Sequence, residues 1–195
     1  MTEPKRIPAA KRKAMLVAAG IEIARAEGGS SVTLARVAKA CGVTKPIAYR
    51  LFVDLPDLLE QMQQQVLAGY EAVIMQALNQ AKAAGARRAE LLGVLARTYV
   101  EHNLADGAVY DTVSAALAAT VAAEEPSLTL PDSYLALARD LFGLPVGQET
   151  TAVVMFLGAA DYLVAAVQTG RVSSQDAIAQ LTRLFEPLSG GQEQQ

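Results

Sequence analysis

The basic side chains of this chain offer clearer chemistry than its few nucleophiles or metal ligands. Residues 1–53 contain ten Lys or Arg and three Glu, a net charge of +7, whereas residues 54–195 carry a net charge of −10. A basic segment joined to an acidic body favours a polyanion as the partner of the first part. The alternative is an ordinary helix with solvated basic side chains, and charge alone does not separate the two.

Few residues are suited to catalysis or to metal binding. The chain has one cysteine, Cys41, and one histidine, His102, so it forms neither an internal disulfide nor a cysteine-based metal cluster. No glycine-rich phosphate loop, H-E-x-x-H motif or paired-carboxylate spacing appears. We therefore expect a protein that is not an enzyme and that holds no cofactor or metal.

The composition favours packed helices over sheets. Of 195 residues, 52% are hydrophobic and 5% aromatic, with no Trp, so burial relies mostly on Ala, Leu and Val. The N-terminus has no apolar targeting segment, and no apolar run of about 18 residues follows. We expect an all-α protein in the cytoplasm that does not bind a membrane.

Helical periodicity and capping residues divide the chain into helices. Apolar residues recur at helical spacing over 8–27, and Thr33, Thr44 and Asp54 precede three further helices, of which the last is long. Turn residues separate the segments beyond Gly85. The helices expected there cover residues 86–103, 108–123, 131–142, 147–169 and 174–187.

Two short helices joined through Cys41-Gly42-Val43 are typical of a helix-turn-helix. Such a unit needs small or apolar residues at the crossing and a glycine at the turn, and Ala38, Gly42, Ala48 and Leu51 fill these places. Its second helix enters the major groove of DNA, which predicts that Thr44 to Arg50 face the bases. The same geometry also occurs as plain packing, so the pattern alone leaves both interpretations open.

The segment from Arg12 to Val66 resembles the N-terminal domain of the TetR family of transcriptional regulators. It contains a helix that ends in a glycine pair, a T-x-x-x-[IV]-A-x-x-x-G-V core, a [ST]-K-x-x-x-Y-x-x-F recognition segment and a D-x-x-D-L-L opening of the next helix. These motifs coincide at the right spacings over about 50 residues. The rest of the chain matches only in length and helical character.

The resemblance implies a homodimer that binds a palindromic DNA operator and responds to a small-molecule effector. The residues that would meet DNA are Thr33, Thr44, Lys45, Pro46, Ile47, Tyr49 and Arg50. Hydroxyl groups suit phosphate oxygens, cationic groups suit phosphates or guanine, and the apolar pair suits a thymine methyl. Tyr49 is expected at a phosphate, with a half-buried packing role as its alternative.

One position departs from the family pattern. Leu55 stands where family members commonly carry a lysine that contacts a backbone phosphate, so one DNA contact is in question. Basic residues near the N-terminus compensate for this loss if they reach DNA, and otherwise belong to a solvated, disordered tail. They are Lys5, Arg6, Lys11, Arg12 and Lys13.

We expect three parts along the chain. They are a helix-turn-helix DNA-binding domain of residues 1–53, a ligand-binding and dimerisation domain of residues 54–188, and a disordered tail of residues 189–195. Residues 152–167 are almost uniformly apolar, more than one face of a monomeric helix requires. The last two helices are therefore expected to pair with those of a second copy.

Polar residues set in apolar helical faces are the candidates for a ligand pocket. They are Tyr99, His102, Tyr110, Met155, Asp161 and Tyr162. For His102, the alternative to a role in ligand binding is a position at a helix end near solvent. Asp161 needs a partner, for which Arg97, a ligand amine or a group across the dimer interface are alternatives.

These observations favour a ligand-responsive transcriptional regulator, acting as a repressor. Two other functions remain open. A non-specific architectural DNA-binding protein would show a salt dependence without base preference, and an all-helical enzyme is the weaker alternative because catalytic residue types are scarce.

Overall fold

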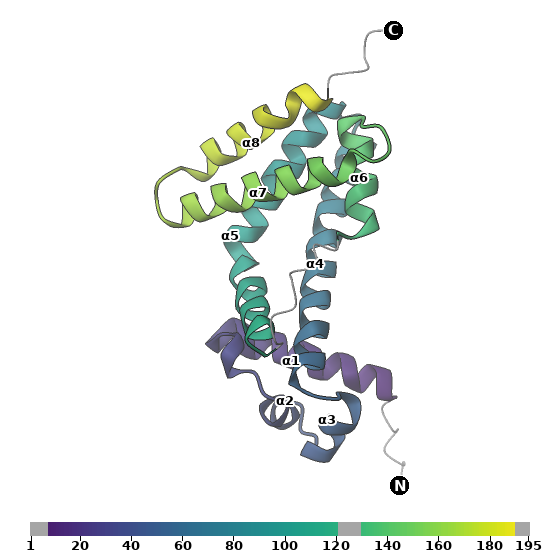
Figure 1. Ribbon diagram of the computed structural model, residues 1–195, viewed down its shortest axis with the longest axis vertical. Coiled ribbons are helices and arrows are strands. Elements are labelled where there is room, and N and C mark those ends of the chain that lie inside the picture. The colour runs from purple at the N-terminus through teal and green to yellow at the C-terminus, as the bar shows by residue number, and fades with distance from the viewer. Residues whose placement is uncertain (1–7, 121–129, 190–195) are drawn as a thin grey trace. The chain divides into compact units, whose positions relative to one another are not determined.

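The computed structural model describes residues 8–120 and 130–189, which form eight α-helices, one short 3-10 helix and no β-strand (Figure 1). The expected all-helical fold is confirmed. These residues pack as two compact units. The first contains residues 8–69 and 106–120, and the second contains residues 70–105 and 130–189.

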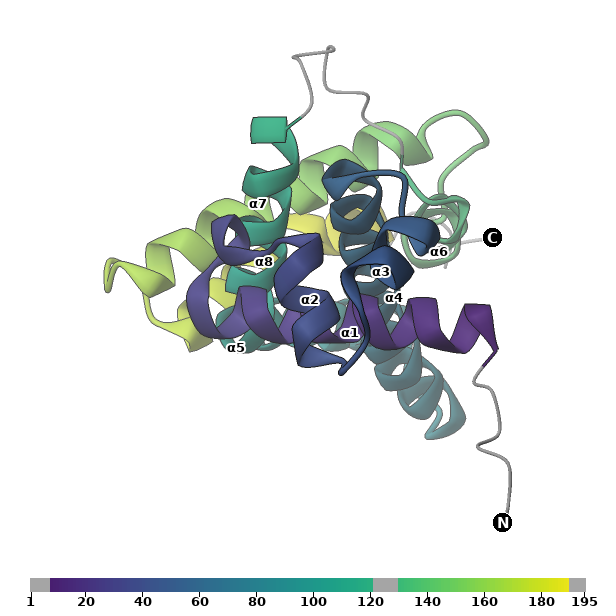
Figure 2. The ribbon, with the colours of Figure 1, turned by 90° about the horizontal axis from the view of Figure 1, so that it is seen from below.

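The first unit is built on α1 (Ala9–Glu27), a 3-10 turn η1 (Gly29–Ser31), α2 (Leu34–Ala40) and α3 (Lys45–Leu51). The helix predicted over 8–27 is confirmed, but Met15 of the predicted apolar pattern is 40% exposed. The residues that α1 buries are Leu16, Val17, Gly20, Ile21 and Ala24. Figure 2 shows α2 and α3 packed beside α1. The helix α1 ends at Gly28, whose φ of 85° lies in the region that favours glycine.

The long helix α4 (Leu55–Ala83) begins with a reciprocal capping arrangement. The backbone N–H of Asp57 donates to Oδ1 of Asp54 (3.0 Å), and the backbone N–H of Val53 donates to Oδ2 of Asp57 (2.9 Å). Two otherwise orphaned N–H groups are thereby satisfied. The start predicted at Asp54 is confirmed.

The helices predicted over 86–103 and 108–123 are one continuous helix, α5 (Arg88–Thr120), so the expected break at residues 104–107 is wrong. A single glycine inside a helix costs only about 1 kcal/mol, and Gly107 is buried. Asp106, which suggested a turn, lies 3.6 Å from the guanidinium of Arg25 on α1. Tertiary packing therefore outweighs the local turn signal.

The C-terminal half of α5 belongs to the core of the first unit. Val109 and Val113 pack with Leu58, Leu59 and Met62 of α4. The approach is closest at η1, where a Cβ on Gly29 would overlap the carbonyl group of Thr112. Only a glycine fits there without displacing backbone atoms.

The second unit consists of the remaining halves of α4 and α5 with α6 (Asp132–Phe142), α7 (Glu149–Gln168) and α8 (Ser174–Ser189). Its core contains three phenylalanines, and the ring of Phe185 lies 5.7 Å from that of Phe142 and 5.3 Å from that of Phe156. Such ring contacts add about 1 kcal/mol each to simple burial.

The structure places parts of α4 and α5 in each packing unit, whereas the expected functional domains meet at residue 53. Packing units and functional domains are different divisions, so the DNA-binding domain of 1–53 and the second domain of 54–188 stay predictions. Most of the expected tail, 190–195, and the basic residues Lys5 and Arg6 lie outside the described residues.

Candidate functional site

The turn between α2 and α3 has the geometry that a helix-turn-helix requires. Gly42 has a φ of 66°, and the backbone N–H of Val43 donates to the carbonyl of Ala38 (3.0 Å). Ala38 and Ala48, the small residues predicted at the crossing, are buried. The predicted helix-turn-helix is confirmed as a structural unit.

The second helix of this unit, α3, is anchored by few residues and leaves the others exposed. Ala48 and Phe52 are buried. Thr44, Lys45, Pro46, Tyr49 and Arg50 are exposed, and Ile47 is half-buried. Because 57% of Tyr49 is accessible, the alternative of a packing role for it loses support.

The two threonines of the predicted DNA surface differ in their bonding. The hydroxyl of Thr33 caps α2 by accepting a hydrogen bond from the backbone N–H of Arg36 (3.2 Å). Thr44 stands at the same position before α3, and its side chain makes no cap hydrogen bond. Its exposed hydroxyl therefore remains available to a partner.

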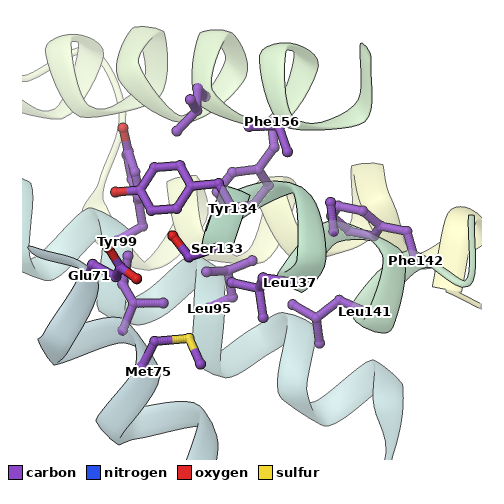
Figure 3. A pocket seen from close by; sticks show the side chains of 14 residues that line it. Glu71, Met75, Leu95, Tyr99, Ser133, Tyr134, Leu137, Leu141, Phe142 and Phe156 are labelled. Carbon is purple, nitrogen blue, oxygen red and sulfur yellow. The ribbon is translucent and has the colours of Figure 1, made fainter. Parts of the chain in front are cut away.

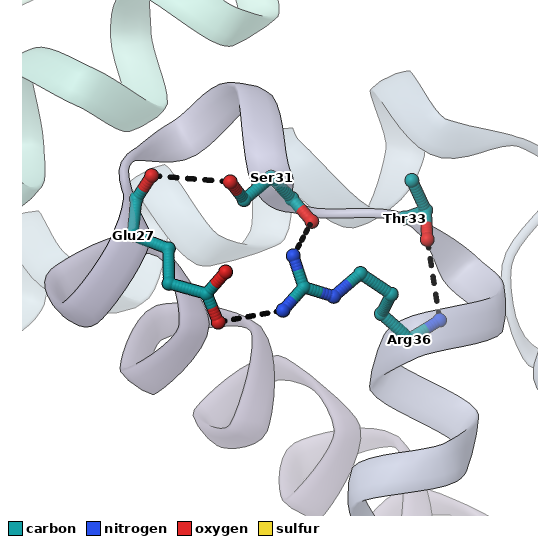
Figure 4. Close-up of polar contacts among 4 residues, drawn as sticks. All are labelled: Glu27, Ser31, Thr33 and Arg36. Atoms are coloured by element: carbon teal, nitrogen blue, oxygen red, sulfur yellow. Dashed lines mark hydrogen bonds and ion pairs between the residues drawn. The ribbon is translucent and has the colours of Figure 1, made fainter.

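A polar network that the sequence reading missed fixes α2 to the end of α1 (Figure 4). Arg36 donates to the carboxylate of Glu27 (2.6 Å) and to the carbonyl of Ser31 (3.0 Å), and the Ser31 hydroxyl donates to the carbonyl of Glu27 (3.1 Å). The hydrogen bond and charge of Arg36 lower the pKa of Glu27. The only sequence signal was an Arg three residues after the N-cap.

Two further contacts support α3 from outside the turn. The ammonium group of Lys13 lies 5.1 Å from the ring centroid of Phe52, a cation–π geometry. Leu55, the residue that replaces the lysine common in the family, is half-buried and packs against the core of the first unit. It is thus a packing residue in this chain.

Cys41 does not form a reactive site. Its thiol lies 3.4 Å from the carbonyl of Met15, and burial raises its pKa. A protonated, partly buried thiol is a poor nucleophile. No group of three or more His, Cys, Asp or Glu able to hold a metal ion occurs among residues 8–120 and 130–189.

The second unit contains a cavity of about 50 Å³ between α4, α5, α6 and α7. Most of its lining side chains are apolar. Figure 3 shows the oxygen atoms of Glu71, Ser133, Tyr99 and Tyr134 toward one end and Leu141 and Phe142 toward the other. An apolar wall with a few grouped polar atoms is the usual form of a small-molecule site.

Of the six predicted ligand residues, Tyr99 lines this cavity and Asp161 supports it. The Tyr99 hydroxyl donates to Oδ1 of Asp161 (2.6 Å), so the partner of Asp161 is Tyr99 and not Arg97. Burial, followed by the hydrogen bond to Asp161, strongly raises the pKa of Tyr99. The phenol therefore stays protonated.

The other four predicted ligand residues do not line the cavity. Met155 and Tyr162 lie on α7 with 55% and 74% of their surface exposed, and Tyr110 belongs to the first unit. His102 lies within α5 and not at a helix end, with its ring edge-on to Tyr70 at 4.3 Å between centroids. Its Nε2 is buried and makes no hydrogen bond with the described residues.

Three residues that line the cavity were not predicted from the sequence: Glu71, Ser133 and Tyr134. Glu71 follows Tyr70 on a long amphipathic helix, where a glutamate is normally solvated, and Ser133 sits in the first turn of α6. The only sequence signal for these residues was Tyr134, an aromatic residue close to the apolar face of its helix. Four separate helices supply the cavity, and their packing decides which residues meet.

An apolar surface runs along α7 on the side opposite its buried face. Ala152, Val153, Phe156, Ala160 and Val164 are buried. The exposed positions at helical spacing are Val154, Met155, Gly158, Asp161, Tyr162 and Ala165. Leu184 of α8 is also exposed, at 58%. Apart from Asp161, these exposed positions are uncharged, and an exposed apolar surface of this kind is a candidate for an interaction site.

By its length and composition α7 is also able to cross a membrane, and it is the one described helix that is. Core helices of soluble proteins meet the same criterion, so this finding is weak support for a membrane span.

No family model and no curated protein sequence matches the chain. Solved structures do. The fatty acid degradation regulator FadR from Bacillus halodurans is 17% identical, with 97% of this chain and 99% of that one covered and a TM-score of 0.60. RolR in complex with its ligand resorcinol is 16% identical over 91% of this chain and 88% of that one, with a TM-score of 0.58.

A third structure carries the family name that the sequence motifs suggest. The TetR-like transcriptional regulator from Rhodococcus sp. RHA1 is 17% identical, covers 95% of this chain and 100% of that one, and has a TM-score of 0.57. Nearly the whole chain is matched each time, which includes the C-terminal helices that the motifs did not reach. The chain therefore has the fold of TetR-type transcriptional regulators, as the resemblance of residues 12–66 predicts.

Proposed function

We propose that this chain is a ligand-responsive transcriptional repressor that binds a palindromic operator as a homodimer and is not an enzyme. The observation that carries the proposal is the exposed face of α3. Lys45, Tyr49 and Arg50 are exposed there, and the hydroxyl of Thr44 is not consumed by capping. Side chains of these types at the start of a recognition helix suit phosphates and base edges.

The apolar surface of α7, together with Leu184, supports the homodimer. Val154, Met155 and Tyr162 are large and exposed in the single chain, and Gly158 lies among them. A glycine in an apolar stripe permits a second helix to approach closely. Association through a twofold axis would bury the same patch on both copies.

The cavity of the second unit supports the effector. Its lining is apolar with four grouped oxygen-bearing residues. RolR, of the same fold, has been solved with resorcinol as its ligand. By analogy of fold alone, we assign the effector of this chain to the cavity lined by Tyr99.

The mechanism we propose is a shift between two conformations of the dimer. In one, the two α3 helices lie about one turn of DNA apart, roughly 34 Å, and fit both half-sites. The effector favours another conformation because it binds that state more tightly. A DNA partner also implies that the protein acts in the cytoplasm and not at a membrane.

Selection of bound duplexes from a random DNA pool tests the proposal. We expect a palindromic consensus, bound tightly and with a steep dependence on salt. Enrichment of no sequence, with weak salt-sensitive binding in both the presence and the absence of small molecules, would favour the architectural alternative. Absence of any DNA binding at low salt would reject both.

A further inference from the structure

The charge of the cavity lining has one sign. Glu71 is the charged residue among the side chains that line it, and the lining includes no Lys, Arg or His. Among residues 8–120 and 130–189 the Glu71 carboxylate forms no ion pair or hydrogen bond. A half-buried carboxylate beside an apolar wall is stabilised by a partner that brings a positive charge.

Aromatic rings lie at the same end of the cavity as this carboxylate. Figure 3 shows Tyr99 and Tyr134 toward the same end of the cavity as Glu71, and the ring of Phe156 lies 5.8 Å from that of Tyr99. The faces of such rings attract cations. The Tyr99 hydroxyl donates to the carboxylate of Asp161, so the proton of this hydroxyl is not directed at the cavity.

The far end of the cavity is suited to a hydrocarbon group. Leu141 and Phe142 offer no polar side-chain atom there. The volume of about 50 Å³ is well below the roughly 300 Å³ at which ligand pockets begin. A ligand is therefore small or displaces a flexible wall residue, for which the unbranched Met75 is suited.

From this arrangement we infer that the effector is a small organic cation with an apolar body, whose ammonium group pairs with Glu71 between the tyrosine rings. The inference rests on the proposed function, because it names the chemical class that the same cavity takes. Carboxylic acids are disfavoured because the Glu71 carboxylate would repel them. Neutral phenols of the kind that RolR binds are the competing outcome.

Calorimetric titration with three matched probes tests the inference. Phenethylammonium, 2-phenylethanol and phenylacetate share a phenyl group and differ in charge. The full-length protein is expected to bind the cation at least about tenfold more tightly than the alcohol, and the anion not measurably. Equal or tighter binding of the alcohol, or no binding of the cation at millimolar concentration, overturns the inference.

Two variants assign the preference to Glu71. Glu71→Gln keeps the shape of the side chain and removes its charge, so it should abolish the preference for the cation and leave alcohol binding within about twofold. Glu101→Gln removes an exposed carboxylate of the same unit that does not line this cavity, and should keep the preference. A Glu71→Gln variant that keeps the tenfold preference would refute the role of Glu71. The comparison of probes on the unaltered protein does not depend on the folding of either variant.

The same protein preparation separates this inference from the proposed function. If it selects a palindromic duplex but shows no preference for the cation, the inference alone fails. If it prefers the cation but binds no DNA, the proposed function fails. Where both hold, phenethylammonium should weaken binding of the selected duplex, and Glu71→Gln should remove that effect.

Discussion

The α3 surface and the α4–α7 cavity use polar side chains in opposite ways. On α3, Lys45, Tyr49 and Arg50 stand exposed around a small buried anchor formed by Ala48 and Phe52. In the cavity, oxygen-bearing side chains gather inside an apolar wall. The first arrangement suits a large polyanion that approaches from solvent, and the second suits a small molecule that must leave water. The two proposed recognition surfaces of this chain therefore differ in their physics.

Loss of the close approach at Gly29 should have the largest effect, and it should affect the first unit. Gly29→Val would place a branched side chain against the backbone of Thr112. We expect the free energy of unfolding in urea to fall by about 3 kcal/mol, with DNA binding lost. Gly69→Ala is the control, because a Cβ there has open space within α4. It should be neutral or stabilising by about 1 kcal/mol. Equal stability of Gly29→Val and the unaltered chain would contradict the packing of η1 on α5.

Charge placed on the α7 surface should break the proposed dimer. Val154→Lys puts an ammonium group in the apolar patch of both copies, and we expect dimerisation to weaken by about 2 kcal/mol or more. Sedimentation at micromolar concentration measures the shift to monomer. Val146→Lys, at a valine that is 85% exposed on the turn before α7, should sediment as the unaltered protein does. If both variants behave alike, the interface lies elsewhere.

Removal of cationic groups from α3 should reduce DNA affinity by smaller steps. Lys45→Ala and Arg50→Ala should each weaken operator binding by about 1 to 2 kcal/mol and lower the slope of affinity against salt by about one. The dimer should stay intact. Arg171→Ala removes an exposed arginine from the turn between α7 and α8, and should leave binding unchanged. Equal losses from all three variants would show that only net charge matters.

The smallest expected effect is on the pH dependence of stability, and it is seen by comparing one carboxylate from each unit, Glu27 and Glu149. The pKa of Glu27 is lowered by Arg36, and that of Glu149 is lowered first by its own backbone N–H, with further contributions from Gly147 and Arg139. Both charged forms stabilise the fold above the ordinary pKa of 4.5, and the contribution is lost as pH falls through the lowered value.

Unfolding measured between about pH 3 and pH 7 tests this expectation. Glu149→Gln should flatten the loss of stability at acid pH more than Glu27→Gln, because Glu149 is buried and Glu27 is exposed. The Arg139 guanidinium lies 3.0 Å from the Glu149 carboxylate, which is the pair that acid would weaken. A larger effect from Glu27→Gln would reverse the comparison.

The difference between the α3 surface and the cavity also explains why the sequence predicts the exposed residues of α3 better than the residues that line the cavity. The proposed DNA contacts other than Thr33 fall within seven consecutive residues, so the turn at Gly42 and the helical period alone decide which side chains are exposed. Their contacts with DNA remain predictions. The cavity instead joins Glu71 with Tyr134 and Phe156, which are far apart in sequence. Only the packing of four helices brings them together.

In a uniformly apolar helix, hydrophobic periodicity does not show which face is buried. In α7 nearly every position is apolar, so the pattern does not tell Phe156, which is buried, from Met155, which is exposed. The ligand roles predicted for Met155 and Tyr162 followed from that ambiguity. The break expected at Asp106-Gly107 failed similarly, because a local turn signal cannot report the tertiary contacts that keep α5 helical.

The most direct test of the account is the ratio of affinities for a selected operator and for a scrambled duplex of the same length and composition, at one fixed salt concentration. Fluorescence anisotropy with a labelled duplex measures both. If α3 reads the DNA sequence, the intact protein binds the operator at least about 10³-fold more tightly, and Arg50→Ala reduces this ratio. Equal affinity for the two duplexes would contradict sequence reading by α3.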